Sequence, residues 1–240
     1  MTEDNNQINN QEHQAHVAKV RAEKQKQADE TLHKLVKDID EHPHDYRTYY
    51  DLGTFLVQLR NYNQAEELLM KAMGLFADQS KKAKNTLMYG LGNVYYAAGE
   101  YDKAIQQFNQ IDDQKLQFDS YIMLAQSYMS KQNYKKAVVF ALTAQGMRRQ
   151  DPSVNQILGD SLLALGNFSE AAQFFDIVLK NDDHNGKANF DRGLIAMVLG
   201  EPFDDYFAKA KRYDHRYFEK GQSRLKDIEK FIQIQKKRDK

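Results

Sequence analysis

The chain has 240 residues, and its 34 Lys and Arg residues balance its 34 Asp and Glu residues, so net charge favours neither nucleic acid nor an anionic membrane as partner. It contains no Cys, which excludes disulfides, thiolate nucleophiles and Cys-based metal sites. With only 3 Pro and 12 Gly, and with much Ala, Leu, Gln, Lys and Glu, the composition predicts an all-α protein.

The N-terminal part divides into two segments of different composition. Residues 1–14 are rich in Asn and Gln and almost without apolar side chains, so we expect a disordered polar tail there. Residues 15–45 carry apolar side chains at helical spacing and predict an N-terminal helix or partial repeat. The start lacks the order of a secretory signal, and no apolar stretch approaches the roughly 20 residues that span a bilayer. We therefore expect a cytoplasmic protein without membrane insertion.

A pair of residues, usually Leu followed by a small residue, recurs from there on. The pairs are Leu52-Gly53, Leu91-Gly92, Leu124-Ala125, Leu158-Gly159 and Arg192-Gly193, at spacings of 39, 33, 34 and 34 residues. Twelve residues after the small residue of the first four pairs stand Ala65, Ala104, Ala137 and Ala171. A regular period of this length indicates a repeat protein.

Each period contains two helical runs separated by a polar turn, as in residues 121–128 and 137–144. The small residues lie where two helices must approach closely. A single helical hairpin cannot bury its apolar face, so the hairpins must stack on one another.

The pattern resembles the tetratricopeptide repeat (TPR) family, in which Leu-Gly, Tyr, Ala, Phe, Ala and Pro recur at set offsets in about 34 residues. The resemblance implies an all-α, right-handed superhelix, an α-solenoid of about five hairpins with N-terminal and C-terminal capping helices. The repeats would span 46–84, 85–117, 118–151, 152–185 and, in degenerate form with Arg192 at the Leu position, 186–215. Residues 216–240 would form the C-terminal capping helix, with Leu225, Ile228, Phe231 and Ile232 as its apolar stripe.

The resemblance also implies a concave surface, lined by the first helix of each repeat, that binds a partner. Carried onto this chain residue by residue, the family's ligand-facing positions are mostly apolar or aromatic. They hold Tyr50, Thr54, Val57, Tyr89, Asn93, Tyr96, Ile122, Gln126, Met129, Gln156, Asp160, Leu163, Phe190, Leu194 and Met197.

These helices would be apolar on two faces, because other positions, such as Leu91, Gly92 and Tyr95, already supply the core. A helix that is apolar on both faces is buried on both sides. Three interpretations stay open for the second face: a partner peptide or helix, the chain's own C-terminal helix folded into the groove, or a wrong phase of the repeat.

The sequence does not favour catalysis. His42 and His44 flank Pro43, which is typical of a turn, and a metal site would need further ligands. Gly90 and Gly92 follow no predicted strand and precede no phosphate-loop Lys. Neighbouring carboxylates diverge on helix faces or turns instead of converging on a substrate. We therefore expect no enzyme, no catalytic residue, no cofactor and no metal.

The predicted function is that of a protein-protein interaction adaptor or scaffold with a partner peptide or helix in the groove. The alternatives are a peptide-sensing regulator that changes solenoid conformation, and a structural self-assembly module. A TPR subfamily that binds chaperone tails uses Lys, Asn and Arg side chains to grip a carboxylate; at the matching positions this chain has Tyr50, Thr54, Gly90, Asp119 and Met123. Binding of that kind is therefore not favoured, and the oligomeric state stays open.

Overall fold

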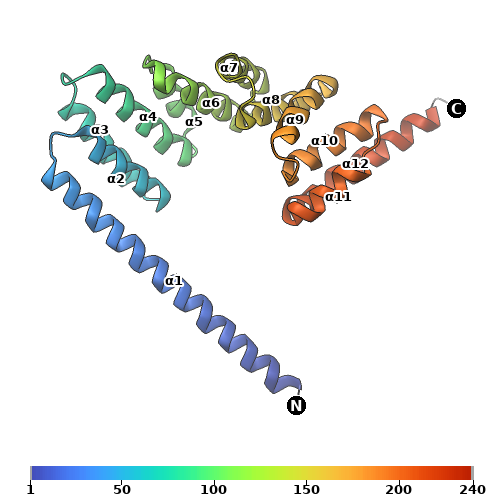
Figure 1. Ribbon diagram of the computed structural model, residues 1–240, viewed down its shortest axis with the longest axis horizontal. Helices are drawn as coiled ribbons and strands as arrows, with labels where there is room; N and C mark the ends of the chain where they lie inside the picture. Colours follow the sequence, from blue (N-terminus) through green and yellow to red (C-terminus); the bar gives the residue numbers. More distant parts are fainter. Residues whose placement is uncertain (1, 239–240) are drawn as a thin grey trace. The chain divides into compact units, whose positions relative to one another are not determined.

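The computed structural model describes residues 2–238, which form α-helices joined by short turns and contain no β-strand (Figure 1). The helices are α1 (Thr2–Glu41), α2 (Tyr46–Gln58), α3 (Tyr62–Leu75), α4 (Lys81–Ala97), α5 (Tyr101–Asn109), α6 (Gln114–Ser130), α7 (Tyr134–Met147), α8 (Pro152–Ala164), α9 (Phe168–Asn181), α10 (Gly186–Leu199), α11 (Asp204–Tyr213) and α12 (His215–Arg238). Among the described residues, no helix is both long enough and apolar enough to cross a membrane.

The helices form two compact units. The N-terminal unit ends at Ala98 and contains α1 to α4; the C-terminal unit starts at Gly99 and contains α5 to α12. Inside each unit, successive helices pack on one another, as α2 does on α3 and α8 on α9, and first helices of neighbouring hairpins also meet, as α6 meets α8. The prediction of an all-α repeat fold made of helical hairpins is confirmed.

Short polar residues and glycines mark the helix ends. Asp151 precedes Pro152 and accepts hydrogen bonds from the backbone N–H groups of Ser153 (2.9 Å) and Val154 (3.2 Å), which caps α8. Gly166, after the same helix, has a φ of 78°, a conformation that costs glycine little. The ends of the helices are therefore specified by residues next to them in the sequence and need no tertiary contact.

Small residues hold the paired helices close together. The four alanines that recur after the Leu-Gly and Leu-Ala pairs are all 0% exposed. A Cβ atom on Gly159 of α8 would lie only 2.8 Å from Cζ of Phe175 in α9, and one on Gly53 would lie 2.9 Å from Leu69. The repeated small residues are therefore required by the close approach of the two helices of a hairpin.

The start of the chain differs from the predicted disordered tail. Helix α1 begins at Thr2, so residues 2–14 are helical in the structure. Residues 2–41 contain neither Gly nor Pro, and helix formation is cooperative, so the helix that the Ala-, Lys- and Glu-rich part favours can extend into the Asn- and Gln-rich part.

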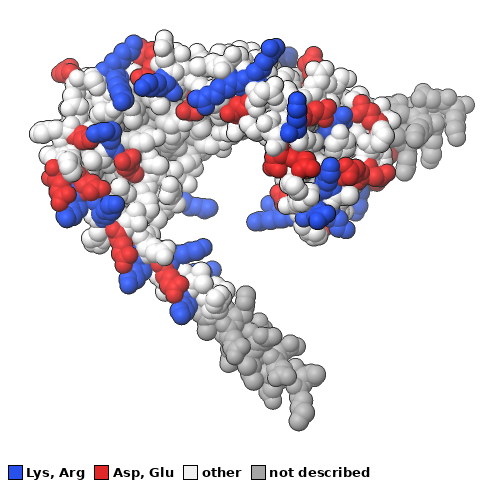
Figure 2. Space-filling model, viewed as in Figure 1, with Lys and Arg blue, Asp and Glu red and all other residues white. Residues whose placement is uncertain are grey.

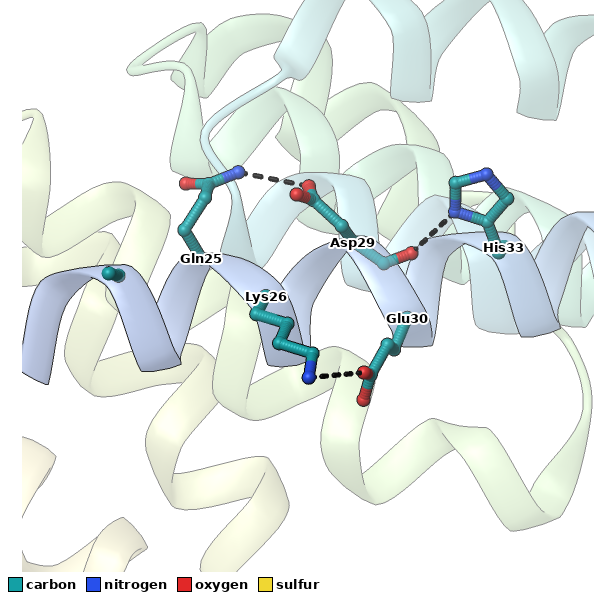
Figure 3. A pocket seen from close by; sticks show the side chains of 6 residues that line it. Gln25, Lys26, Asp29, Glu30 and His33 are labelled. Atoms are coloured by element: carbon teal, nitrogen blue, oxygen red, sulfur yellow. Dashed lines mark hydrogen bonds and ion pairs between the residues drawn. The ribbon is translucent and has the colours of Figure 1, made fainter.

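Charged and polar side chains cover the exposed surface of α1. Lys26 forms an i,i+4 ion pair with Glu30 at 3.8 Å, and Gln25 donates a hydrogen bond to Asp29 at 2.9 Å, while His33 lies 2.8 Å from the carbonyl oxygen of Asp29 (Figure 3). Both signs of charge occur along the described part of the helix (Figure 2). Exposed pairs of this kind each stabilise a helix by only about 0.3–0.5 kcal/mol.

The last helix, α12, packs on α10 and α11, and its Gly221 lies against Phe190 of α10. We expect Gly221→Ala to destabilise the protein by about 1–3 kcal/mol, although Ala is the better helix former, because overpacking outweighs propensity. The new Cβ would lie 2.2 Å from Cζ of Phe190, whose side chain is fully buried. The matched control is Gly146→Ala in α7, where nothing lies within 4 Å of the new Cβ. Urea unfolding should show the control unchanged or slightly stabilised; equal midpoints for both variants would contradict the close contact.

Candidate partner-binding surface

The first helices of successive hairpins in the C-terminal unit are α6, α8 and α10, and each contacts the next (Figure 1). The predicted binding positions on α6 and α8 are all half-buried: Ile122, Gln126, Met129, Gln156, Asp160 and Leu163. In the N-terminal unit the corresponding positions on α2 and α4 are half-buried, with Thr54 exposed: Tyr50, Thr54, Val57, Tyr89, Asn93 and Tyr96. All of these side chains keep surface that a partner can reach.

The burial of α4 supports the phase of the repeat. Leu91 and Tyr95 are 1% and 6% exposed, and the Tyr95 hydroxyl donates a hydrogen bond to the Glu66 carboxylate at 2.8 Å. Tyr89 and Tyr96 on the same helix are only half-buried. The core face and the predicted binding face of α4 are therefore different faces.

Gly90 of α4 has a packing role. A Cβ there would lie 3.0 Å from Cδ2 of Tyr50, so the tyrosine ring of α2 packs against the backbone of α4 at this glycine. This agrees with the sequence interpretation of Gly90 as a helix-packing residue.

The prediction is wrong for the fifth repeat. Phe190, Leu194 and Met197 are 0%, 1% and 8% exposed, so they do not line an open groove. Phe190 and Leu194 belong to an apolar cluster with Ala210 of α11 and Phe218 of α12. The physical reason is that α12 packs on α10. For this repeat, the chain's own C-terminal helix covers the face, which was one of the interpretations that the sequence left open.

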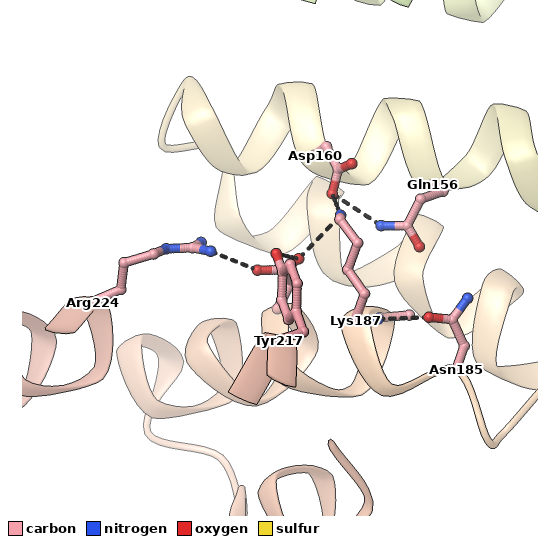
Figure 4. A network of polar contacts seen from close by, with 8 residues as sticks. Gln156, Asp160, Asn185, Lys187, Tyr217 and Arg224 are labelled. Carbon is pink, nitrogen blue, oxygen red and sulfur yellow. Dashed lines mark hydrogen bonds and ion pairs between the residues drawn. The ribbon is translucent and has the colours of Figure 1, made fainter. Parts of the chain in front are cut away.

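A buried polar network, which no sequence pattern indicated, joins α8, α10 and α12 (Figure 4). The Asp191 side chain is 2% exposed and accepts hydrogen bonds from Lys187 (3.2 Å), Tyr217 (3.0 Å) and Arg224 (3.0 Å). Lys187 also donates to Asp160, one of the predicted binding residues. The carboxylate of Asp191 is thus compensated by two cations and a hydroxyl, as a buried charge requires.

The pKa values in this network follow from burial and neighbouring charge. Burial raises the pKa of Asp160 above its usual value, against the opposing effect of Lys187. Burial disfavours the charge of Lys187, but the Asp160 and Asp191 carboxylates together outweigh it and raise the pKa of Lys187. Burial and the Asp191 charge raise the pKa of Tyr217 to about 12. Lys187 therefore stays charged, and Tyr217 stays neutral, at any physiological pH.

Arg192 stands at the position where the other repeats have Leu, and its side chain forms ion pairs. Its guanidinium contacts the carboxylates of Asp176 at 2.8 Å and Glu201 at 2.9 Å and lies 5.2 Å from the centre of the Tyr206 ring. The departure from the repeat pattern therefore links α9, α10 and α11.

Two groups of potential metal ligands occur in turns. His42 and His44 are both exposed. Sequence reasoning passed over Asp182, Asp183 and His184, between α9 and α10, whose ligand atoms lie within 4.8 Å of one another; all three side chains are exposed. Their carboxylates already pair with the His184 side chain or backbone, so this arrangement by itself indicates no metal site.

Comparison with known protein families agrees with this geometry. Three family models described as tetratricopeptide repeat match residues 44–111, 118–151 and 158–203, which together are more than half of the chain. The chain belongs to the tetratricopeptide repeat family. The matches begin two residues before α2 and end after α10, so α1, α11 and α12 lie outside them.

Two curated TPR relatives are each 26% identical to the chain. Tetratricopeptide repeat protein 21B of Xenopus laevis matches over 167 residues, which are 67% of this chain and 12% of that protein. Tetratricopeptide repeat protein 8 of Homo sapiens matches over 162 residues, 64% of this chain and 30% of that protein. The chain thus spans less than a third of the length of either relative.

Solved TPR structures share the fold at low sequence identity. PilF of Pseudomonas aeruginosa has a TM-score of 0.69 and 16% identity, covering 84% of this chain and 91% of PilF. YrrB, described as a TPR protein with an unusual peptide-binding site, has a TM-score of 0.57 and 21% identity, covering 76% of this chain and 93% of YrrB. At these identities the likeness concerns the fold alone.

Proposed function

We propose that this TPR protein is a non-enzymatic adaptor or scaffold that binds a peptide or helix of a partner protein on the first helices of its repeats. The observation that carries the proposal is the row of half-buried aliphatic and amide side chains on α6 and α8. TPR proteins are interaction modules, and the description of YrrB as having a peptide-binding site is consistent with this use of the fold.

The row on α6 has the chemistry of a peptide site. Ile122 and Met129 pack with one side against the core cluster of the C-terminal unit and leave the other side exposed. Gln126 lies between them along the helix, and its amide can both donate to and accept from a partner backbone. Apolar contacts would supply affinity and the amide would supply orientation.

On α8, Leu163 continues the apolar surface, while Gln156 donates to Asp160 at 2.9 Å and is already engaged. The row of accessible side chains ends at the Asp160–Lys187 pair and at α12, because Phe190 and Leu194 on α10 are buried. Within the C-terminal unit the proposed site therefore consists of α6 and the adjoining part of α8. Tyr89, Asn93 and Tyr96 on α4 are proposed as partner contacts of the N-terminal unit.

We assign no catalytic, cofactor or metal role to this surface. Aliphatic and amide side chains supply neither a nucleophile nor a general base near neutral pH, so binding is the chemistry that they can perform.

Site-specific photo-crosslinking in extract of the native cell tests the proposal. A photoreactive phenylalanine derivative at Gln126 should form a specific adduct, whereas the same group at Gln173, exposed on the second helix α9, should not. The partner identified in this way should then bind Met129→Glu about thirtyfold more weakly, since contact residues of this kind contribute about 2 kcal/mol. Melting of this variant should stay close to wild type, because Met129 is only half-buried.

Adduct formation at Gln173 alone would overturn the proposal. So would unchanged affinity of both Met129→Glu and Leu163→Glu for the captured partner.

A further inference from the structure

The second helix of one repeat, α7, exposes a row of large apolar side chains. Val139, Leu142 and Met147 are 60%, 47% and 46% exposed. The first two lie three residues apart, on one face of the helix. Exposed apolar side chains that cluster on one face, instead of occurring singly, are typical of interaction sites.

The repeat itself offers an internal comparison. Val139 and Leu142 stand two and five residues after the recurring Ala137. At the same offsets α9 has Gln173 and Asp176, and α5 has Gln106 and Asn109. All four of these polar side chains are exposed. On α3 the same offsets hold Glu67 and Met70, and Met70 is 54% exposed, so only α7 of these helices has apolar residues at both offsets. The fold therefore does not need two apolar residues at these positions.

The charged residues of α7 and those next to its two ends are of one sign. Residues 120–150 contain no Asp or Glu, while Lys135 and Lys136 lie in the first turn of α7 and Arg148 and Arg149 follow its end. Over α6 and α7 the visible surface is mainly uncharged, with basic side chains and smaller acidic areas beside them (Figure 2). Among the described residues, none of these four cations forms an ion pair; Lys136 lies 5.1 Å from the centre of the Tyr128 ring and Arg148 lies 3.8 Å from that of Phe118.

The position of two of these cations is unfavourable for α7 itself. The N-terminus of a helix carries the positive end of its dipole, so Lys135 and Lys136 in the first turn oppose it. An acidic partner would relieve this repulsion as well as neutralise the charge.

We propose that the exposed face of α7 binds an acidic amphipathic helix of a partner protein. Its apolar side would cover Val139, Leu142 and Met147, and its Asp or Glu residues would meet Lys135 at one end and Arg149 at the other. The 14 residues of α7 span about 21 Å, so a partner helix of about four turns matches the face. This surface lies on the second helix of its repeat and is separate from the first-helix site of the proposed function.

A second copy of the chain is a poorer occupant on grounds of charge. Packing α7 against α7 of another copy, whether parallel or antiparallel, places basic ends against basic ends. Like charges at close range disfavour such a dimer. Charge complementarity therefore points to a different, acidic partner.

The test uses the full chain and two labelled synthetic helical peptides of about 16 residues. One carries a row of Leu with Glu at both ends, and the other has Lys in place of Glu. Fluorescence anisotropy should show the acidic peptide binding at least about tenfold more tightly, with affinity falling as salt is added. Equal binding of the two peptides, or no binding of either, would refute the proposal.

Variants can be taken from the chain's own repeats. Val139→Gln with Leu142→Asp copies the residues of α9, so the fold should be kept while affinity for the acidic peptide falls at least about tenfold. The control is Met70→Asp on α3, which removes a 54% exposed Met whose neighbours Glu67 and Lys71 pair with each other at 2.7 Å. The control should bind like wild type; loss of binding in Met70→Asp would place the peptide elsewhere and contradict the proposal.

Charge reversal and vesicles complete the test. Lys135→Glu with Arg149→Glu should reverse the preference, so that the Lys peptide binds more tightly than the Glu peptide. An unchanged preference would overturn the role of these cations. Phosphatidylcholine vesicles with phosphatidylserine serve as the lipid probe. The face is a membrane-binding surface, and the proposal is wrong, if three results come together: the vesicles bind the chain, they do not bind the Leu142→Asp variant, and neither peptide binds the chain.

Discussion

Replacing Phe190 by Ala should destabilise the C-terminal unit by about 3–5 kcal/mol, the usual cost of removing a buried aromatic ring. Phe190 is 0% exposed. Its ring centroid lies 5.7 Å from that of Phe207 in α11, 5.6 Å from that of Tyr217 and 5.8 Å from that of Phe218 in α12. One substitution therefore removes the ring that α10, α11 and α12 share.

Urea unfolding measures the effect, and limited proteolysis locates it. Trypsin should cleave α12 faster in Phe190→Ala than in wild type, because the ring holds that helix against α10. The matched control is Phe203→Ala, a half-buried ring that packs on Phe207 at 5.8 Å and should cost less than half as much. If both variants lose the same stability, Phe190 is not the centre of this cluster.

Asp191→Ala should also destabilise the protein by about 3–5 kcal/mol, since it removes the buried carboxylate on which three side chains of this network converge. Lys187 would keep Asp160 as a partner, but Arg224 and the Tyr217 hydroxyl would lose their hydrogen-bond acceptor. The control is Glu67→Ala, which removes the exposed ion pair to Lys71 and should leave the stability nearly unchanged, because water and salt screen exposed pairs. Urea unfolding of both variants measures the difference. If Asp191→Ala lost no more stability than the control, the role of Asp191 as the centre of the buried network would be contradicted.

Asp191→Asn separates charge from shape at the same position. Burial and the Asp191 charge hold the pKa of Tyr217 at about 12, above its ordinary value of 10.0. The neutral phenol is the form that the folded state favours, so its contribution to stability is complete below pH 10 and is lost as the pH rises towards 12. In Asp191→Asn the pKa of Tyr217 should fall but stay above 10.0, because burial remains. Ultraviolet absorbance of the phenolate measures this; an unchanged pKa would show that Asp191 does not act on Tyr217.

The C-terminal helix limits where a partner can bind. Because α12 covers Phe190 and Leu194, the first-helix row of the C-terminal unit is open on α6 and on part of α8 only. The second-helix face on α7 lies outside this row and has a different chemistry, apolar between basic ends. The two proposed surfaces can therefore be altered independently, and variants of one serve as controls for the other.

The sequence by itself determined the repeat fold, because its causes are local. Gly159 and Ala171 must be small where two helices of one hairpin touch, and Asp151 with Pro152 starts a helix whatever lies beyond it. Such requirements recur at fixed spacing, so they can be read from one chain without its structure. The same spacing predicts which face of α4 belongs to the core: Leu91 is buried there, while Tyr89 on the other face is only half-buried.

Only the tertiary structure decided which apolar faces the chain covers itself. Phe190 and Ile122 hold equivalent positions in the repeat pattern, yet Phe190 is buried by residues of α12 while Ile122 stays half-exposed. The burial of Phe190 depends on Phe218 and Gly221 in α12, a helix that follows the last predicted repeat and does not keep the repeat pattern. The Asp191 network was not predictable for the same reason, because its members come from three helices and follow no common spacing. Contacts between distant segments leave no periodic signal, and these contacts determine where the repeat surface ends.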